Sequence, residues 1–162
     1  LCYLNPTWSE GSGGELELIP FLDRPVQIRP LHNRVAIFYS DRVLHRVLPA
    51  VTERLCFTVW LDSRTGAVNR DCDINFTSPR ASSRAEVVSL LRASPTQRAV
   101  ARVVYEEEFK TSLVDCMGGT DGLKYMLASH QAEVERLNGA SKQMQAYLTA
   151  LRECKPSGSV VL

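Results

Sequence analysis

The chain has 162 residues, 44% of them hydrophobic, and a formal net charge of +1, which predicts one globular domain or a domain with a helical appendage. A net charge this close to zero does not attract nucleic acid, so we expect no nucleic-acid partner. Every apolar run is far shorter than the roughly 18 residues of a membrane helix, so we expect no membrane partner. The five cysteines are odd in number and lack C-x-x-C spacing, which favours free thiols in the cytoplasm or the nucleus over a disulfide or zinc framework.

Segments of strand length begin at the first residue. Residues 1–5 form the first, and because it starts at a leucine inside an apolar run, we expect the sequence to begin part-way through a longer protein. Residues 6–14 have the proline and glycines of a turn, and no G-K-[ST] follows to favour a phosphate-binding loop. In residues 15–21 apolar side chains alternate with Glu15 and Glu17, so we expect both carboxylates on a wet face.

Further short strands are expected up to residue 62. Residues 26–28 are a brief strand, and residues 33–40 are apolar on both faces, which predicts a central, buried strand. Two more strands, around His45 and Arg54, lie on either side of a turn at Pro49. Six or seven short strands with no helix between them predict an antiparallel sandwich or barrel of jelly-roll type.

His45 and Arg54 stand nine residues apart (54 − 45) in this apolar region. Side chains of a strand repeat with period two, so Arg54 shares one face with Cys56, Thr58 and Trp60. A lone histidine on an apolar face is more often a satisfied core residue than a ligand. A buried guanidinium, however, keeps its charge and needs an anion, and no acid stands beside Arg54 on that face. A bound carboxylate ligand is therefore a candidate.

The composition changes after residue 62. Residues 63–82 lose the period-two pattern and predict a linker between a domain at 1–62 and a helical segment at 83–155, with a tail at 156–162. Ser83 and Glu86 have capping-box spacing, and a second helix is expected to begin at Ser94-Pro95 and to stop after Met117, at Gly118-Gly119. Within it, residues 106–108 are three glutamates, interpreted as a solvated face rather than a metal site.

The last helical part carries a heptad seam. Its positions alternate at spacings of four and three, and they are Leu123, Leu127, His130, Val134, Leu137, Ser141, Met144, Leu148 and Leu151. The register crosses Asn138-Gly139 without slipping, which predicts one long helix, although an interior glycine costs about 1 kcal/mol. His130 is interpreted as a tolerated polar residue of the seam rather than a metal ligand. The seam either packs on the other helices, which we favour, or pairs two chains.

Several separated motifs in residues 1–62 stand in a recognisable order. They are YLN at 3–5, Trp8, GGELEL followed by Pro20, and PLHNRVAIFYSDRVLHRVLPAVTERLCFTVW at 30–60. This order resembles the C-terminal half of the catalytic domain of Fe(II)/2-oxoglutarate-dependent dioxygenases of prolyl 4-hydroxylase type. An arginine nine positions after the histidine is closer to the hypoxia-inducible-factor prolyl hydroxylases than to the collagen prolyl hydroxylases, which have lysine. The resemblance implies an α+β fold, a partial double-stranded β-helix (jelly roll) followed by an α-helical C-terminal segment.

The resemblance also implies roles for single residues. His45 would be the second histidine of the 2-His-1-carboxylate iron triad. Arg54 would clamp the distal carboxylate of the cosubstrate 2-oxoglutarate, with the hydroxyl of Tyr3 as a second donor. The further pocket-lining positions that it implies are Val47, Thr58 and Trp60. Such an enzyme uses Fe(II), 2-oxoglutarate and O2, with ascorbate as a further cofactor, to hydroxylate a substrate, by resemblance a prolyl residue in a protein or peptide, and releases succinate and CO2.

One motif of such enzymes is absent from these 162 residues. H-x-D supplies their first histidine and their carboxylate, and none of the three histidines here is followed by aspartate at the second position. Two hypotheses follow: a truncated sequence of an active oxygenase, inactive by itself, or a non-catalytic jelly-roll and helical module for binding or oligomerisation. The coding sequence before Leu1 discriminates between them, because an in-frame H-x-D favours the enzyme and an initiating methionine close to Leu1 favours the module.

Overall fold

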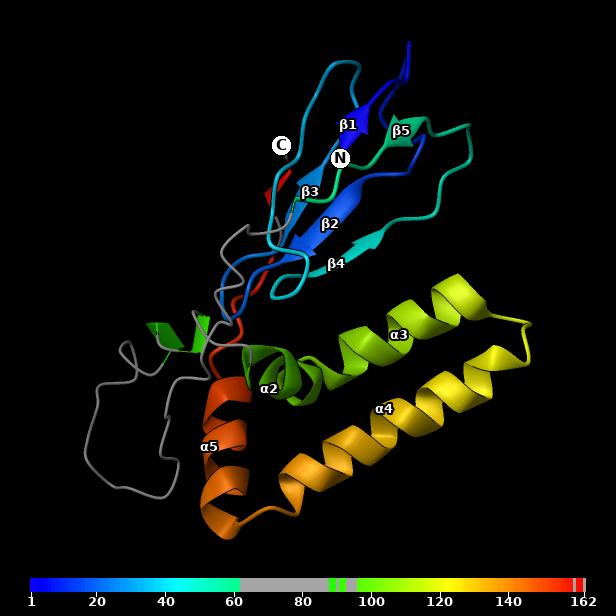
Figure 1. The fold of residues 1–162 in the computed structure, drawn as a ribbon. Helices are drawn as coiled ribbons and strands as arrows, with labels where there is room; N and C mark the ends of the chain where they lie inside the picture. Colours follow the sequence, from blue (N-terminus) through cyan, green and yellow to red (C-terminus); the bar gives the residue numbers. More distant parts are fainter. Residues whose placement is uncertain (62–87, 90, 93–95, 159, 162) are drawn as a thin grey trace. The chain divides into compact units, whose positions relative to one another are not determined.

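The computed structural model describes residues 1–61, 88–89, 91–92, 96–158 and 160–161, which belong to two compact units (Figure 1). The first unit comprises the described residues of 1–68 and 157–162, and the second comprises those of 69–156. The predicted linker at 63–82, the capping box at Ser83 and the helix start at Ser94-Pro95 lie outside the described residues. In the described part of the chain, no helix is both long enough and apolar enough to span a bilayer.

The first unit is built from two small sheets. β1 (Cys2–Tyr3) pairs with β5 (Cys56–Phe57), and β4 (Leu44–Val47), β2 (Leu16–Ile19), β3 (Val26–Ile28) and β6 (Val160–Val161) form a second sheet in that order. Every pairing is antiparallel except that of β6, which joins β3 in parallel. The segment 156–162, predicted as a tail, therefore supplies a strand to the first unit.

The core of the first unit joins the two sheets. Tyr3 of β1, Leu16 of β2 and Ala36 form its buried centre, and the partly buried side chains packed against them are Leu1, Leu18, Ile28, Phe38 and Cys56. Two hydrogen bonds hold Ala36 beside Leu1, at the start of β1. The Ala36 amide donates to the Leu1 carbonyl, and the Leu1 amino group donates to the Ala36 carbonyl. Residues from both sheets thus pack around the Tyr3 ring.

The prediction of a central, buried strand at residues 33–40 is wrong. This segment lies beside β1 through one isolated bridge, between Cys2 and Val35, and through flanking backbone hydrogen bonds to Leu1 and Tyr3, but it is not a strand of either sheet. Ala36 and Phe38 face the core, whereas Ile37 is 86% exposed and Tyr39 is 71% exposed. An apolar composition on both faces was therefore not sufficient to predict burial of both faces.

Glu17 is buried, although the sequence predicted that its carboxylate faces solvent. It is 8% exposed and lies between its two cross-strand partners, Gln27 of β3 and Arg46 of β4. Arg46 Nε donates to Glu17 Oε2 at 2.6 Å, and Gln27 Nε2 donates to Glu17 Oε1 at 3.2 Å. Both carboxylate oxygens are satisfied, which is the condition under which a charged group can be buried in a sheet.

The second unit contains four described helices, α2 (Thr96–Val104), α3 (Glu106–Met117), α4 (Gly122–Asn138) and α5 (Lys142–Arg152). The single helix expected to run to Met117 is interrupted at Tyr105, where the backbone has φ −108° and ψ 38°. The predicted stop holds, since α3 ends at Met117 and Gly119 has φ +80°.

The glutamate run at the start of α3 is not a uniformly solvated face. Glu106 accepts from Lys110 at 2.7 Å and from Arg152 of α5 at 3.2 Å, and Glu108 accepts from Lys155 at 2.6 Å. Glu107 alone among the three has a mostly exposed side chain. Two of the three carboxylates therefore tie α3 to the end of α5.

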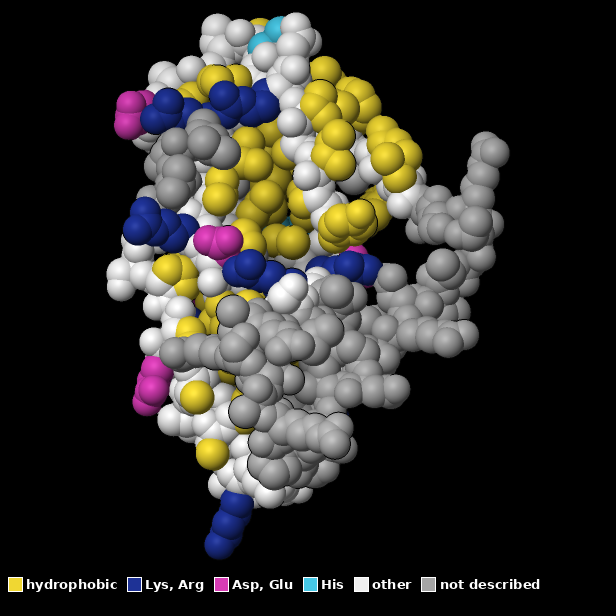
Figure 2. Space-filling model, turned by 90° about the vertical axis from the view of Figure 1, so that its left-hand side faces the viewer, with side chains coloured by type: hydrophobic (Ala, Val, Ile, Leu, Met, Phe, Trp, Pro, Cys, Tyr) yellow, Lys and Arg dark blue, Asp and Glu magenta, His cyan; other side chains and the backbone are white. Residues whose placement is uncertain are grey.

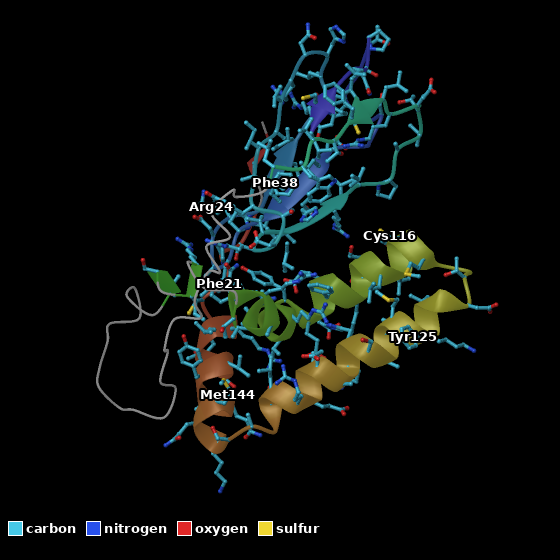
Figure 3. The ribbon with its side chains drawn as sticks, viewed as in Figure 1. Phe21, Arg24, Phe38, Cys116, Tyr125 and Met144 are labelled. Atoms are coloured by element: carbon cyan, nitrogen blue, oxygen red, sulfur yellow. The ribbon has the colours of Figure 1, made fainter. Side chains whose placement is uncertain are left out.

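The heptad seam runs through two helices rather than one, so the prediction of a single long helix is wrong. α4 ends at Asn138, and α5 begins after Ser141, whose Oγ accepts from the Met144 amide at 3.0 Å as an N-cap. The seam residues that are buried in the second unit are His130, Val134, Leu137, Met144, Leu148 and Leu151. Figure 3 labels Met144 on α5. These six residues are buried within the second unit, whereas Leu123 and Leu127 are only partly buried, and pairing of two chains through the seam stays a prediction.

Candidate functional site: Arg54, Tyr3 and His45

The pairing of β4 with β2 sets the direction of His45. His45 stands opposite Leu18 and Val47 stands opposite Leu16. Directly opposed residues of an antiparallel pair point to the same face, and on β2 that face carries the core residue Leu16. His45 and Val47 therefore point to the same side of the sheet as Leu16. Both side chains nevertheless lie outside the buried core, since each is exposed.

Two contacts orient the His45 ring. Its Nδ1 lies 2.8 Å from the Val43 carbonyl oxygen. Because a carbonyl only accepts, Nδ1 donates its proton there, and the neutral ring keeps the Nε2 lone pair for a ligand. The ring also meets Phe38 edge-on, with centroids 4.9 Å apart, and Phe38 (labelled in Figure 3) packs against the Tyr3 core. His45 thus borders the same core as the residues described next.

Arg54 is fixed at two of its three guanidinium nitrogens. Nε donates to the Gly14 carbonyl at 2.9 Å, and Nη1 donates to the sulfur of Cys56 at 3.1 Å. The guanidinium carbon lies 5.1 Å from the centroid of the Tyr3 ring, within the range of a cation–π contact. The arginine is therefore held against Tyr3 before any ligand arrives.

Two buried polar atoms at this place have no hydrogen-bond partner in the described part of the chain. They are Nη2 of Arg54 and the hydroxyl oxygen of Tyr3, whose side chain is fully buried. Burial raises the pKa of the Tyr3 hydroxyl, while the Arg54 guanidinium acts to lower it, although the two groups do not reach hydrogen-bond geometry. Leaving a buried donor unpaired costs about 1–3 kcal/mol, so the pair suits a ligand that accepts from both. A carboxylate does so, as predicted for these two residues.

Some residues that build the site were not predicted as partners of Arg54. A Cβ atom on Gly14, whose φ is +79°, would lie 3.1 Å from Arg54 Cδ, so the glycine leaves room for the arginine. Asn5 is buried, and its side-chain oxygen accepts from the Leu55 amide at 2.6 Å, which holds the chain beside Arg54 against β1. Period-two alternation did place Cys56 on the face of Arg54, and that was the available signal.

The remaining predicted lining residues lie at exposed positions. Thr58 and Trp60 follow the end of β5, and Trp60 is 73% exposed, while Val47 is 41% exposed on β4. Figure 2 shows hydrophobic side chains gathered on one side of the first unit, in the upper part of the view. The roles of Thr58, Trp60 and Val47 in a cosubstrate pocket stay predictions.

Comparison with known proteins gives a family match and a structural match. Residues 1–62 match the family model described as the 2OG-Fe(II) oxygenase superfamily. A solved structure that matches comes from work on the crystal structure and expression patterns of prolyl 4-hydroxylases from Phytophthora capsici, with 37% sequence identity and a TM-score of 0.78. The match covers 95% of this chain and 50% of that chain, so this chain spans half the length of its structural relative. The comparison with curated proteins gave no match.

These matches bear on the predicted fold. Antiparallel strands followed by C-terminal helices, similar to a prolyl 4-hydroxylase structure, confirm the α+β jelly-roll class. The helical segment, for which the sequence suggested no family, is included in the likeness, because residues 1–62 alone do not amount to 95% of the chain. The oxygenase superfamily implies Fe(II) and 2-oxoglutarate as cofactor and cosubstrate.

The described residues fit 2-oxoglutarate better than they fit Fe(II). The unpartnered donors of Arg54 and Tyr3 fit a carboxylate of 2-oxoglutarate. Across the described ranges, however, no group of three or more His, Cys, Asp or Glu side chains is arranged to hold a metal ion. His45 is one candidate ligand, and a facial triad needs three, so these residues do not make a complete iron centre.

Proposed function

We propose that this chain is part of a 2-oxoglutarate- and O2-dependent dioxygenase that hydroxylates a prolyl residue in a protein or peptide. Within it, Arg54 and Tyr3 bind the distal carboxylate of 2-oxoglutarate. The observation that carries the proposal is the pair of buried donors, Arg54 Nη2 and the Tyr3 hydroxyl, that have no partner among the described residues. The superfamily match over residues 1–62 and the likeness to a prolyl 4-hydroxylase support the reaction class.

The finer features of the proposal follow from the sequence. Arginine at position 54, rather than lysine, favours the hypoxia-inducible-factor prolyl hydroxylase branch. Ascorbate is proposed as a further cofactor, and the cytoplasm or the nucleus as the compartment. Neither nucleic acid nor a membrane is proposed as a partner. Self-association through the heptad seam stays a prediction that sedimentation of the chain tests.

The chain contributes binding and orientation to the reaction. The Gly14 carbonyl and the Cys56 sulfur accept hydrogen bonds from Arg54 and hold its guanidinium. The Val43 carbonyl accepts from Nδ1 of His45, which leaves the Nε2 lone pair of the ring available to a ligand. Because the sequence has no H-x-D, we expect the 162 residues alone to bind 2-oxoglutarate but to release no succinate.

Calorimetric titration of the chain with 2-oxoglutarate tests the clamp. We expect saturable binding by the unchanged chain, and binding at least about tenfold weaker in Arg54→Ala, because a charge-assisted hydrogen bond is lost. Arg24→Ala is the matched control, since Arg24 is an exposed arginine of the same unit (Figure 3) and its removal should leave affinity unchanged. Equal affinity in Arg54→Ala, or no binding by the unchanged chain, would contradict the proposal.

A further inference from the structure

The sulfur of Cys56 is a structural partner of the arginine clamp. It lies 3.1 Å from Arg54 Nη1 and is the acceptor for that nitrogen. Cys56 stands directly opposite Tyr3 in the β1–β5 pair, so both side chains lie on the same face. Cys56 therefore touches both residues whose remaining donors are unpartnered.

The geometry of a guanidinium explains why this contact matters. The group is planar, so its orientation is fixed once two of its nitrogens are held. One hydrogen bond, from Nε to the Gly14 carbonyl, still allows the plane to rock about that contact. The second bond, from Nη1 to the Cys56 sulfur, removes this freedom and sets the direction of Nη2. A carboxylate then meets a donor that needs no reordering on binding.

We propose that Cys56 is a positioning residue of the carboxylate clamp, acting through Arg54, a proposal that rests on the function proposed above. The competing explanation is that Cys56 only fills space, because it is half-buried and packs against the core of Tyr3, Leu16 and Ala36. The two explanations differ in what they require of position 56. Positioning requires a hydrogen-bond acceptor, whereas packing requires apolar volume.

Three substitutions separate acceptor from volume. Cys56→Ser keeps an acceptor of similar size, Cys56→Val keeps apolar volume without an acceptor, and Cys56→Ala removes both. Cys2→Ala is the matched control. Cys2 is also a half-buried cysteine of the same pair of strands, but it stands opposite Phe57, whereas Cys56 stands opposite Tyr3. A melting temperature for each variant reports whether it folds.

The first measurement needs no ligand. Nitrogen-15 relaxation of the Arg54 Nε–H group reports the order of the guanidinium directly. We expect its order parameter to fall in Cys56→Ala and Cys56→Val, and to stay near that of the unchanged chain in Cys56→Ser and Cys2→Ala. An unchanged order parameter in folded Cys56→Val would overturn the positioning role, whether or not the chain binds 2-oxoglutarate.

The second measurement is calorimetric titration with 2-oxoglutarate. We expect binding to be about fivefold weaker in Cys56→Val and Cys56→Ala, because 2-oxoglutarate must then order the guanidinium on binding, and to recover in Cys56→Ser. Affinity that follows side-chain volume, with Val equal to the unchanged chain and Ser weakened, would also overturn the proposal. Failure of the proposed function has a different signature, since Arg54→Ala and the unchanged chain would then bind equally.

Discussion

The guanidinium carbon of Arg54 lies 5.1 Å from the ring centroid of Tyr3, and each residue has one buried polar atom without a partner in the ranges that the structure describes. The two residues are far apart in sequence and meet because β1 pairs with β5, where Tyr3 stands opposite Cys56. The clamp is thus a product of non-local strand pairing. Substitutions of Tyr3 and of Gly14 should both weaken binding, but they should differ in their effect on stability.

Tyr3→Phe should weaken binding and leave the fold intact. The change removes one of the two donors, so we expect the dissociation constant for 2-oxoglutarate to rise about tenfold. It also removes a buried hydroxyl that has no partner in the described part of the chain, while the ring and its contact with Arg54 remain. We therefore expect an unfolding midpoint equal to or higher than that of the unchanged chain, measured by thermal melting beside the titration. A lower midpoint would mean that the hydroxyl has a structural partner.

Gly14→Ala should weaken the clamp through Arg54. The new methyl group would lie 3.1 Å from Arg54 Cδ and 3.3 Å from Ala50 Cβ, and φ +79° is strained for any residue with a Cβ atom. We expect a loss of stability of about 1–2 kcal/mol from the backbone, measured by urea denaturation, and weaker 2-oxoglutarate binding.

Gly11→Ala is the control for backbone strain. Gly11 has a similar φ of +86°, and nothing lies within 4 Å of the Cβ position. It should therefore lose comparable stability with no change in affinity. If both variants bind equally well, the space at Gly14 is not needed by Arg54.

Much of the first unit was predictable from the sequence because its signals are local. Proline and glycine predicted the turn before β2, and period-two alternation placed Arg54 on one face with Cys56. Burial of Glu17 was not predictable in this way. It depends on Arg46 and Gln27, which reach Glu17 only through the register of β2 with its two neighbours.

The helical unit shows a similar limit. The spacing of apolar residues predicted which residues of α4 and α5 are buried, because a helix that packs along one side buries residues three and four positions apart. It could not show the break between them, since a register that continues across Asn138-Gly139 is compatible with one helix or two. The deciding interaction is the N-cap at Ser141, which the heptad pattern counted as a position of the seam.

Ser141→Ala should destabilise the second unit by removing this cap. The Ser141 Oγ accepts from the Met144 amide at 3.0 Å, and loss of such a cap typically costs about 1 kcal/mol. Urea denaturation followed by helical circular dichroism measures the change. Ser129→Ala is the control, because Ser129 is exposed within α4 and alanine is the better helix former there. Equal stability of the two variants would show that Ser141 does not cap α5.

His130 should make the helical unit sensitive to mild acid. It is 3% exposed and stacks on Phe109, with ring centroids 5.1 Å apart. Burial lowers its pKa below 6.5, and the charges of Arg102 and Lys110 lower it further, against the opposing effect of Glu106. The unfolded chain therefore takes up the proton first as the pH falls. The free energy of unfolding should be greatest above about pH 6.5 and should decline below it, by at most about 1.4 kcal/mol per pH unit.

Urea denaturation at pH 7.5, 6.5 and 5.5, followed by helical circular dichroism, checks the dependence on His130. His130→Phe keeps an aromatic ring against Phe109 and removes the titrating group, so its stability should be flat over this range. The Lys110 contact lowers the pKa of Glu106 from 4.5, so the stability that Glu106 contributes is lost only as the pH falls below about 4.5, outside this window. His32→Gln, at an exposed position of the first unit, should keep the decline of the unchanged chain. A decline that persists in His130→Phe would assign the acid sensitivity to another group.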